Sequence, residues 1–317
     1  MEKTNQQKAL LRDILTGTAV SGFIYAASIL LPIIGFFLSL LIPLPTLLYR
    51  LKLGRIHGLI IPILVLIIFS LTAGASILDT VFLGELLLLG FITGELIEVG
   101  YSIEKTIFFS CITTLLTTVV GVLLYCFASN IGPISLISDY IVKNLELTMA
   151  LYKSMGMPEE NIQLLSDSLK TIEYVLIRVL PALFISSTLF ITWINILGAR
   201  TFFLKKGITL KGYEKLNQWK VPDYLVWTVI ASAVLLFLPV SLIKMIGMNG
   251  MIILMTIYFF QGIAVVSYFF KKKKFPMLLR VTLYSVIVIQ QLIMLLVIGL
   301  GFFDTWLNFR KLNVDKR

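Results

Sequence analysis

Residues 106–128 read TIFFSCITTLLTTVVGVLLYCFA, a stretch without a charged side chain that is long enough to cross a lipid bilayer. A spanning helix needs about 20 apolar residues, because the hydrocarbon core is about 30 Å thick. Backbone groups in lipid must also be hydrogen-bonded within the chain, which favours helices over open strands. The stretch therefore predicts a transmembrane helix.

Similar runs recur along nearly the whole chain, in which 58% of the 317 residues are hydrophobic and only 14% are charged. A soluble domain could not bury so much apolar surface, so we expect an all-α, polytopic membrane helix bundle. Pro32 disfavours helix at the residue before it, so the first two runs are interpreted as a hairpin at Leu31–Pro32, with one long tilted helix as the alternative. Nine spans are predicted, at residues 14–31, 33–48, 58–77, 81–97, 106–128, 174–197, 224–243, 250–270 and 277–303.

Lysine and arginine residues gather in short segments, and their positions predict the orientation of the spans. The segments are the N-terminus and residues 50–55, 200–220 and 271–280. Short loops rich in Lys and Arg stay on the cytoplasmic side, and nine spans from a cytoplasmic N-terminus place all four segments there. We therefore expect a multi-pass protein of the bacterial cytoplasmic membrane. The basic tail from Arg310 would then lie outside, unless the last apolar run does not cross fully or an upstream signal overrides the tail.

The net charge of +10 is explained by these flanking clusters. Basic residues at the membrane surface are attracted to anionic lipid headgroups by about 1 kcal/mol each. Because the charges flank spans and form no compact domain, we expect the lipid bilayer as partner and no nucleic acid.

Two domains are predicted from the distribution of apolar runs. Residues 1–200 would form a six-helix membrane bundle, with an extracytoplasmic helical segment near residues 130–173. Residues 201–317 would form a cytoplasmic basic loop and a three-helix membrane bundle. Pro158, Glu159 and Glu160 suit the first turn of a helix, so the segment near 130–173 is interpreted as an amphipathic cap, with a simple linker as the alternative.

Polar side chains within the predicted spans are the candidates for function, because ionisable groups are costly in lipid. Glu95 and Glu98 are three residues apart and share a helix face, and Gly90 and Gly94 allow close approach of another helix. The alternatives are that the acids are interfacial or paired with Arg or Lys, and that the hydroxyl and amide groups serve helix packing. The candidate substrate-binding residues are Glu85, Glu95, Thr188, Thr192, Asn195 and Gln261.

Motifs of soluble enzymes are absent from the sequence: there is no phosphate-binding Gly-x-x-x-x-Gly-Lys-Ser/Thr loop and no His-Glu-x-x-His zinc helix. Cys111 and Cys126 fall within one span and are interpreted as small buried apolar residues. We therefore expect no enzymatic activity, no cofactor and no metal site. ATP-driven transport would need a coupling subunit as partner.

Three stretches of the C-terminal third carry a resemblance to a known family. They are WKVPDYLVW at residues 219–227, YFFQG at 258–262 and GLGFFDTWLNFR at 299–310. On these stretches the chain resembles the YybS-like family of uncharacterised bacterial integral membrane proteins, which implies membrane insertion but no established activity. Asn308 stands where a second acid is expected from the family.

The last stretch is interpreted as a structural motif of Asp304, Trp306, Asn308 and Arg310. We expect a short interfacial helix after Phe303, in which Arg310 pairs with Asp304, with a lipid phosphate or with a carboxylate of another span.

The first six spans also resemble the substrate-binding (S) components of energy-coupling-factor vitamin transporters. Gly22 and Ala26 form a small-xxx-small step in the first span, and in S components a small-residue first helix contacts the transmembrane partner. The resemblance implies such a contact at Gly22 and Ala26. Our functional hypothesis is therefore a transporter-like protein that binds or moves a small molecule or lipid, with a non-transporting membrane scaffold or assembly partner as the alternative.

Overall fold

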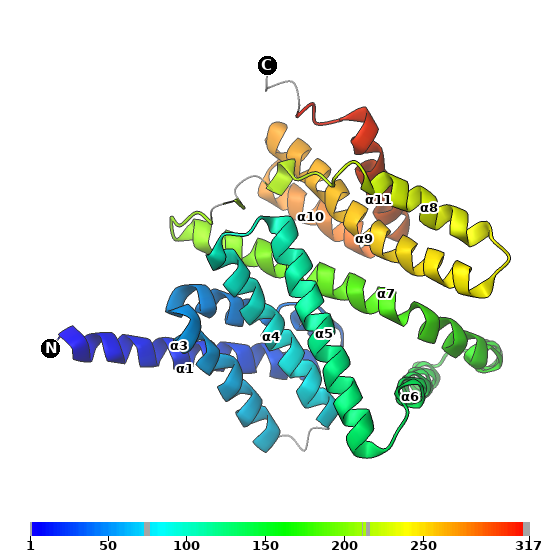
Figure 1. Ribbon diagram of the computed structural model, residues 1–317, viewed down its shortest axis with the longest axis horizontal. Coiled ribbons are helices and arrows are strands. Elements are labelled where there is room, and N and C mark those ends of the chain that lie inside the picture. The colour runs from blue at the N-terminus through cyan, green and yellow to red at the C-terminus, as the bar shows by residue number, and fades with distance from the viewer. Residues whose placement is uncertain (1, 73–76, 211, 214–215, 313–317) are drawn as a thin grey trace. The chain divides into compact units, whose positions relative to one another are not determined.

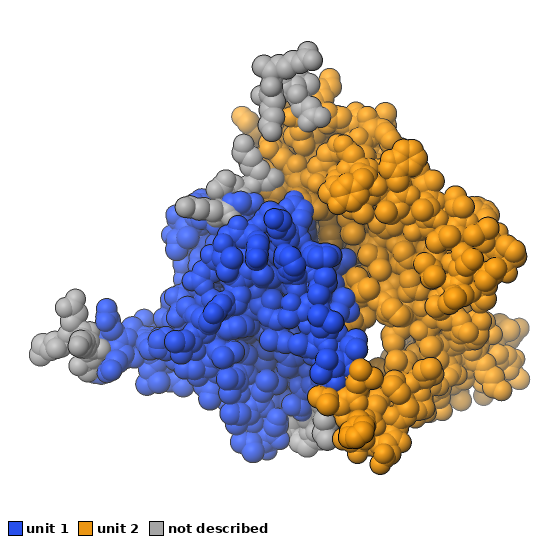
Figure 2. All heavy atoms as spheres, in the orientation of Figure 1, with its two compact units in different colours: residues 1–121, 187–214 blue, residues 122–186, 215–317 orange. Residues whose placement is uncertain are grey.

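The computed structural model describes residues 2–72, 77–210, 212–213 and 216–312 of the chain. Every regular element within these residues is a helix (Figure 1). The chain divides into two compact units, which are described separately here (Figure 2): unit 1 holds residues 1–121 and 187–214, and unit 2 holds residues 122–186 and 215–317. Residues 122–186 thus group with the C-terminal third, whereas the predicted domain boundary at residue 200 stays a prediction.

Unit 1 is an all-helical bundle. Its complete helices are α1 (Glu2–Leu30), α2 (Pro32–Ser39), α3 (Pro43–Thr72) and α4 (Ile77–Val99), and it also holds most of α5 (Ile103–Ser129) and the end of α7 (Glu159–Lys205).

The break between α1 and α2 lies at Leu31, whose backbone is extended and is followed by Pro32 at the first position of α2. A Cβ atom on Gly35 would lie 2.2 Å from the carbonyl oxygen of Ser28, so α2 folds back closely onto α1. The predicted hairpin at Leu31–Pro32 is therefore confirmed over one long helix. The second predicted span is wrong as a single helix, because α2 has only eight residues and a turn at residues 40–42 separates it from α3.

Helix α3 reverses its direction at Gly54, whose φ of 78° is readily adopted only by glycine. A Cβ atom on Gly58 would lie 2.8 Å from Cα of Arg50, although residues eight apart in a continuous helix are separated by about 12 Å. The element is therefore a helical hairpin with a first arm at residues 43–53 and a second arm at residues 55–72. The basic segment 50–55, predicted between two spans, forms the tip of this hairpin.

Helix α4 packs tightly on the first arm of α3 through two glycines. A Cβ atom on Gly90 would lie 2.3 Å from the carbonyl oxygen of Pro43, and one on Gly94 would lie 2.8 Å from Cγ of Arg50. The prediction that Gly90 and Gly94 allow close helix approach is confirmed.

Tyr213 anchors the end of unit 1 to the start of α5. Its hydroxyl lies 2.7 Å from the Thr106 hydroxyl and donates to the carbonyl oxygen of Tyr101 at 3.1 Å. Burial raises the pKa of Tyr213 above its usual 10.0, so the phenol stays protonated and able to donate.

Unit 2 contains α6 (Pro133–Ser154), the short 3₁₀ helix η1 (Leu216–Gln218), α8 (Leu225–Phe237), α9 (Ser241–Lys272), α10 (Met277–Ile289) and α11 (Gln291–Leu307), together with the end of α5 and the start of α7. The predicted helix start at Pro158 and Glu159 is confirmed, because α7 begins at Glu159. Helix α7 then continues through the sixth predicted span, so the segment near 130–173 comprises α6 and the first turns of α7.

An asparagine side chain from α9 bonds the backbone of α7 next to Pro181. Asn249 Oδ1 accepts the N–H of Ala182 at 3.0 Å, and Asn249 Nδ2 donates to the carbonyl oxygen of Arg178 at 2.8 Å. Ala182 and Arg178 are the donor and acceptor that an unbroken helix would pair. The amide thus pairs with backbone groups on either side of Pro181, and sequence reasoning missed Asn249.

The C-terminal spans differ from their predicted form. Helices α8 and α9 lie side by side (Figure 1) and are joined at residues 238–240, so the predicted boundary between residues 243 and 250 is wrong. The last predicted span, 277–303, is not one helix, because α10 and α11 are bent by 102° at Gln290.

By length and composition, six helices of the described residues could cross a membrane, or seven if α10 and α11 form one broken span. That number includes residues 34–71 as one span. Helix α8, with 13 residues, is about 20 Å long and shorter than the hydrocarbon core. The predicted number of nine spans is therefore not confirmed.

Candidate functional site

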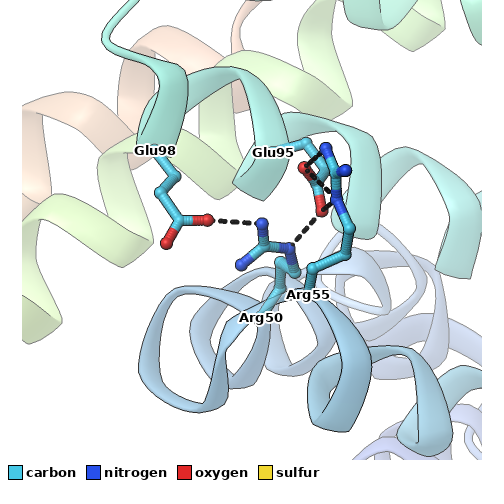
Figure 3. A network of polar contacts seen from close by, with 4 residues as sticks. All are labelled: Arg50, Arg55, Glu95 and Glu98. Atoms are coloured by element: carbon cyan, nitrogen blue, oxygen red, sulfur yellow. Dashed lines mark hydrogen bonds and ion pairs between the residues drawn. The ribbon is translucent and has the colours of Figure 1, made fainter.

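Four ionised side chains meet in unit 1 between the tip of the α3 hairpin and the end of α4 (Figure 3). Arg50 Nε donates to Glu95 at 2.5 Å, and Arg50 Nη2 donates to Glu98. Arg55 donates to both oxygens of Glu95, at 2.7 Å from Nη2 and at 3.0 Å from Nε. We call these four residues the charged cluster; Glu95 bridges its two arginines.

Glycines allow the charged cluster to form. The reversal at Gly54 brings Arg50 and Arg55 from different arms of α3 to the same carboxylate. The aliphatic part of Arg50 lies between Gly58 and Gly94, where a Cβ atom on either glycine would come within 2.8 Å of an arginine carbon. A larger residue at Gly94 would push Arg50 away from α4, and one at Gly58 would push Arg50 away from the second arm of α3.

Exposure divides the cluster into an inner and an outer part. The side chains of Arg50 and Glu95 are 2% and 15% exposed, whereas those of Glu98 and Arg55 are 53% and 72% exposed. Nη1 of Arg50 has no hydrogen-bond partner among the described residues. The attraction between Arg50 and Glu95 is strengthened because burial lowers the local dielectric constant. The exposed side chains of Glu98 and Arg55 can instead exchange their partners for water or for an ionic ligand.

Glu95 is thus paired with two arginines inside the protein. Pairing with Arg or Lys was the predicted alternative to a role in substrate binding. Glu85 accepts a hydrogen bond from the Thr117 hydroxyl at 2.9 Å. The predicted role of both acids in substrate binding stays a prediction.

The predicted polar stripe on α7 is buried and serves contacts within unit 1. Thr192 donates to the carbonyl oxygen of Thr188 at 2.7 Å, one turn earlier. Asn195 Nδ2 donates to the carbonyl oxygen of Leu40 at 2.8 Å, which ties α7 to the turn between α2 and α3. A role of Thr188, Thr192 and Asn195 in ligand binding stays a prediction.

Gln261 belongs to a different arrangement, in unit 2, which we call the C-terminal network and which consists of Gln261, Asp304 and Arg310. Arg310 donates to Asp304 at 2.7 Å from Nη2 and at 3.2 Å from Nε, and Gln261 Nε2 donates to the same Asp304 oxygen at 3.3 Å. All three side chains are fully buried. Gln261 Oε1 also accepts the N–H of Val221 at 2.9 Å.

Close packing of α9 on α11 supports this network. A Cβ atom on Gly262 would lie 2.0 Å from the carbonyl oxygen of Val297, and one on Gly301 would lie 2.1 Å from that of Tyr258. The expectation of a separate interfacial helix after Phe303 is wrong, because α11 continues to Leu307 and ends at Asn308 in the left-handed conformation. Trp306 packs edge-on against Phe302 with ring centroids 4.9 Å apart.

Arg310 also fixes where the chain lies after α11. Its Nη1 donates to the carbonyl oxygens of Asn217 at 3.1 Å and Trp219 at 2.8 Å. Because these residues touch, a tail outside the membrane and a cytoplasmic segment 200–220 cannot both be correct. The contact supports the alternative in which the last apolar run does not cross fully.

A groove of about 400 Å³ lies between α1 and the second arm of α3. The space next to Gly22 is open, since no heavy atom lies within 4 Å of a Cβ atom built there. Thr18, at one end, is 92% buried and its hydroxyl has no hydrogen-bond partner among the described residues. The lining residues of this α1–α3 groove are Thr18, Gly22, Tyr25, Ala26, Ile29, Leu30, Val65, Ile68 and Phe69.

Sequence reasoning singled out Gly22 and Ala26 but missed that they face Val65 and Phe69 across a groove. It treated Arg50 and Arg55 only as markers of orientation. The sequence did contain a signal for the charged cluster. Glu95 and Glu98 lie on one face of an apolar helix, where carboxylates need cations from a neighbouring segment.

A family model described as "Predicted membrane protein (DUF2232)" matches residues 19–305. The match includes the whole charged cluster, most of the groove and Asp304, and it ends before Arg310. No curated protein and no solved structure matches the chain.

Proposed function

The chain belongs to the DUF2232 family of predicted membrane proteins, and we propose that it is a transporter-like protein that binds and moves a small molecule or lipid. The observation that carries this proposal is the α1–α3 groove, with an open glycine in its wall and an unpartnered hydroxyl at one end. The role is non-enzymatic, and a coupling subunit supplies the energy for movement.

The lining of the groove defines the class of ligand. Its walls are mostly apolar and contain no ionised side chain, which suits an uncharged, elongated hydrocarbon body. The hydroxyl of Thr18 has lost its water without gaining a partner, which costs free energy. A ligand with one hydrogen-bonding group placed next to Thr18 regains that interaction once the Thr18 side chain turns its hydroxyl toward the groove.

The charged cluster acts as a latch for the groove. Its outer arginine, Arg55, begins the second arm of α3, and the same arm contributes Val65, Ile68 and Phe69 to the groove. Movement of this arm away from α1 would separate Arg55 from Glu95. The ion pairs therefore hold the arm in the arrangement described here.

We propose that the following parts of the chain are all cytoplasmic: the N-terminus, the tip of the α3 hairpin, the segments 200–220 and 271–280, and the residues around Arg310. The positions of Lys and Arg support this orientation, as do the contacts of Arg310 with Asn217 and Trp219. In this orientation α10 and α11 enter and leave on the cytoplasmic side.

Single cysteines test this orientation in a background without Cys111 and Cys126. Cysteines replacing Lys205, Lys273 and Lys311 should resist a membrane-impermeant thiol reagent in intact cells and react after permeabilisation. A cysteine replacing Lys153 on α6 should react in intact cells. Labelling of Lys311→Cys without permeabilisation would contradict the re-entrant α10–α11 segment.

Substitution of Gly22 tests the groove. Gly22→Leu should fill the groove and reduce the amount of ligand retained after purification in native lipid, measured by mass spectrometry, by at least roughly tenfold, as expected for a loss of about 1.4 kcal/mol. Stability should not fall, because no heavy atom lies within 4 Å of a Cβ atom at this position, the rest of the side chain enters the open groove, and Leu is a better helix former than Gly.

Ala19→Leu is the matched control, since it adds the same side chain to an exposed position of the same helix. Equal ligand content in both variants and the unmodified protein would contradict binding in the groove.

The second candidate function is a membrane scaffold. It is favoured by the internal pairing of polar groups in the C-terminal network and at Asn249. In that case a helix of a partner protein occupies the groove at Gly22 and Ala26. Purification in native lipid then recovers a stoichiometric protein and no small molecule.

A further inference from the structure

The polar end of the α1–α3 groove lies close to the point where α1 enters the membrane. The last charged residue of α1 is Asp13, and the groove begins at Thr18. Ionised residues belong at the membrane surface, and Thr18 lies about 7 Å beyond Asp13 along the helix axis. The polar layer of each leaflet is about 5–7 Å thick. Thr18 is therefore at the depth of the ester groups of a phospholipid.

From this end the groove extends over the depth of one leaflet. Its lining on α1 runs from Thr18 to Leu30, which are about 18 Å apart along the helix axis. Half of the hydrocarbon core is about 15 Å thick. The opposite wall is apolar, and Phe69 in this wall packs edge-on against Tyr25 of α1 with ring centroids 4.6 Å apart. The groove, which lies wholly within unit 1, thus has the length of one acyl chain.

Two cations continue the groove toward the N-terminus of α1. Gly22, Leu15 and Lys8 are spaced by seven residues, so they share one face of the helix. Arg12 lies one turn from Lys8, and both cationic side chains are exposed. They stand before the apolar part of α1, at the level of lipid headgroups.

The neighbouring acid does not neutralise these cations. Asp13 pairs with Lys52 on the first arm of α3, at 2.7 Å. Lys8 and Arg12 form no ion pair with any residue that the structure describes. Two positive charges therefore remain at the headgroup end of the groove, where they attract anionic lipid.

We infer that the α1–α3 groove holds an acyl chain of an anionic glycerophospholipid, with its ester group next to Thr18 and its phosphate at Lys8 and Arg12. In the proposed orientation this is a lipid of the cytoplasmic leaflet. The inference rests on the proposed function and adds the class of ligand to it. Length selects an acyl chain, and charge selects an anionic headgroup, because an uncharged amphiphile leaves Lys8 and Arg12 without a counter-ion.

Native mass spectrometry of the full chain in mild detergent, with added lipids of known structure, tests this inference. Dioleoyl phosphatidylglycerol should bind as one molecule per chain, at least roughly tenfold more tightly than dioleoyl phosphatidylcholine, which has the same chains but no net charge. Dihexanoyl phosphatidylglycerol has the same headgroup but short chains. It should bind at least roughly hundredfold more weakly than the dioleoyl lipid, because it buries fewer methylene groups.

Removal of the two cations tests the headgroup site directly. Lys8→Gln/Arg12→Gln should lower the affinity for dioleoyl phosphatidylglycerol by roughly tenfold or more and leave that for dioleoyl phosphatidylcholine unchanged. Lys143→Gln/Lys153→Gln is the control, since it removes the same charge from exposed positions of α6. It should change neither affinity.

The outcomes separate this inference from the proposed function. Equal affinities for the two dioleoyl lipids, or full phosphatidylglycerol binding by Lys8→Gln/Arg12→Gln, would overturn the anionic headgroup. If Gly22→Leu still lowered lipid binding relative to Ala19→Leu, binding in the groove would stand without that headgroup. Equal lipid binding by Gly22→Leu and Ala19→Leu would overturn the inference together with the proposed function.

Discussion

Glu95→Gln is expected to lower the free energy of unfolding by about 3 kcal/mol or more, because it leaves the buried Arg50 without its inner counter-ion. Arg50 is 2% exposed and keeps only the exposed Glu98 as a charged partner, while Arg55 loses its bonds to Glu95. The measurement is the unfolding free energy in mild detergent, together with the midpoint of thermal unfolding.

Glu98→Gln is the matched control on the same helix. Glu98 also pairs with Arg50 but is 53% exposed, and exposed ion pairs contribute about 0–1 kcal/mol. Similar small losses of unfolding free energy for both variants would show that buried Arg50 does not depend on Glu95 as its counter-ion. They would contradict the proposal that the charged cluster holds the second arm of α3 in place.

Asp304→Asn and Arg310→Gln should each lower the unfolding free energy by about 3–5 kcal/mol, because each leaves the other member of a fully buried ion pair uncompensated. Arg310→Gln also leaves the carbonyl oxygens of Asn217 and Trp219 without its donors. Since both variants break one interaction, the double variant should be little worse than the more severe single one.

Lys220 and Asp223 provide the control for this pair. They form an ion pair of 2.8 Å just before α8, but Asp223 is largely exposed, so Lys220→Gln and Asp223→Asn should each cost less than about 1 kcal/mol. Additive losses from Asp304→Asn and Arg310→Gln would contradict their coupling in the C-terminal network.

The apolar runs, the hairpin at Pro32 and the close approach at Gly90 and Gly94 could be predicted because each depends on local sequence. Apolar length dictates spanning helices, proline ends a helix, and paired glycines on one face admit a neighbour. The same reasoning located the basic tip of α3, although it predicted a loop where Gly54 reverses a nearly continuous helix.

The pairing of Arg310 with Asp304 was among the predicted alternatives. The partners of Glu95 and Gln261 and the carbonyl acceptors of Arg310 could not be predicted, because they come from segments forty or more residues away for Glu95 and Gln261 and more than ninety for Arg310. Periodicity tells which residues share a helix face but not which helices become neighbours. The bonding of Asn249 to the backbone next to Pro181 is of the same kind.

The bend at Gln290 has a weak local signal that sequence reasoning did not use. No glycine or proline marks it, but four β-branched residues, Val286 to Ile289, precede it. Such residues lower helix propensity only slightly. The bend therefore depends on tertiary packing, including the close contact of α11 with α9 at Gly262 and Gly301.

The most direct test of the proposed function is an electron cryo-microscopy map of the protein in native-lipid discs, with a bound antibody fragment to aid alignment. The account predicts elongated density in the α1–α3 groove, running past Gly22 with its polar end next to Thr18, whose hydroxyl has turned toward it. An empty groove, or a groove filled by a helix of another protein, would contradict ligand binding there and leave the scaffold function.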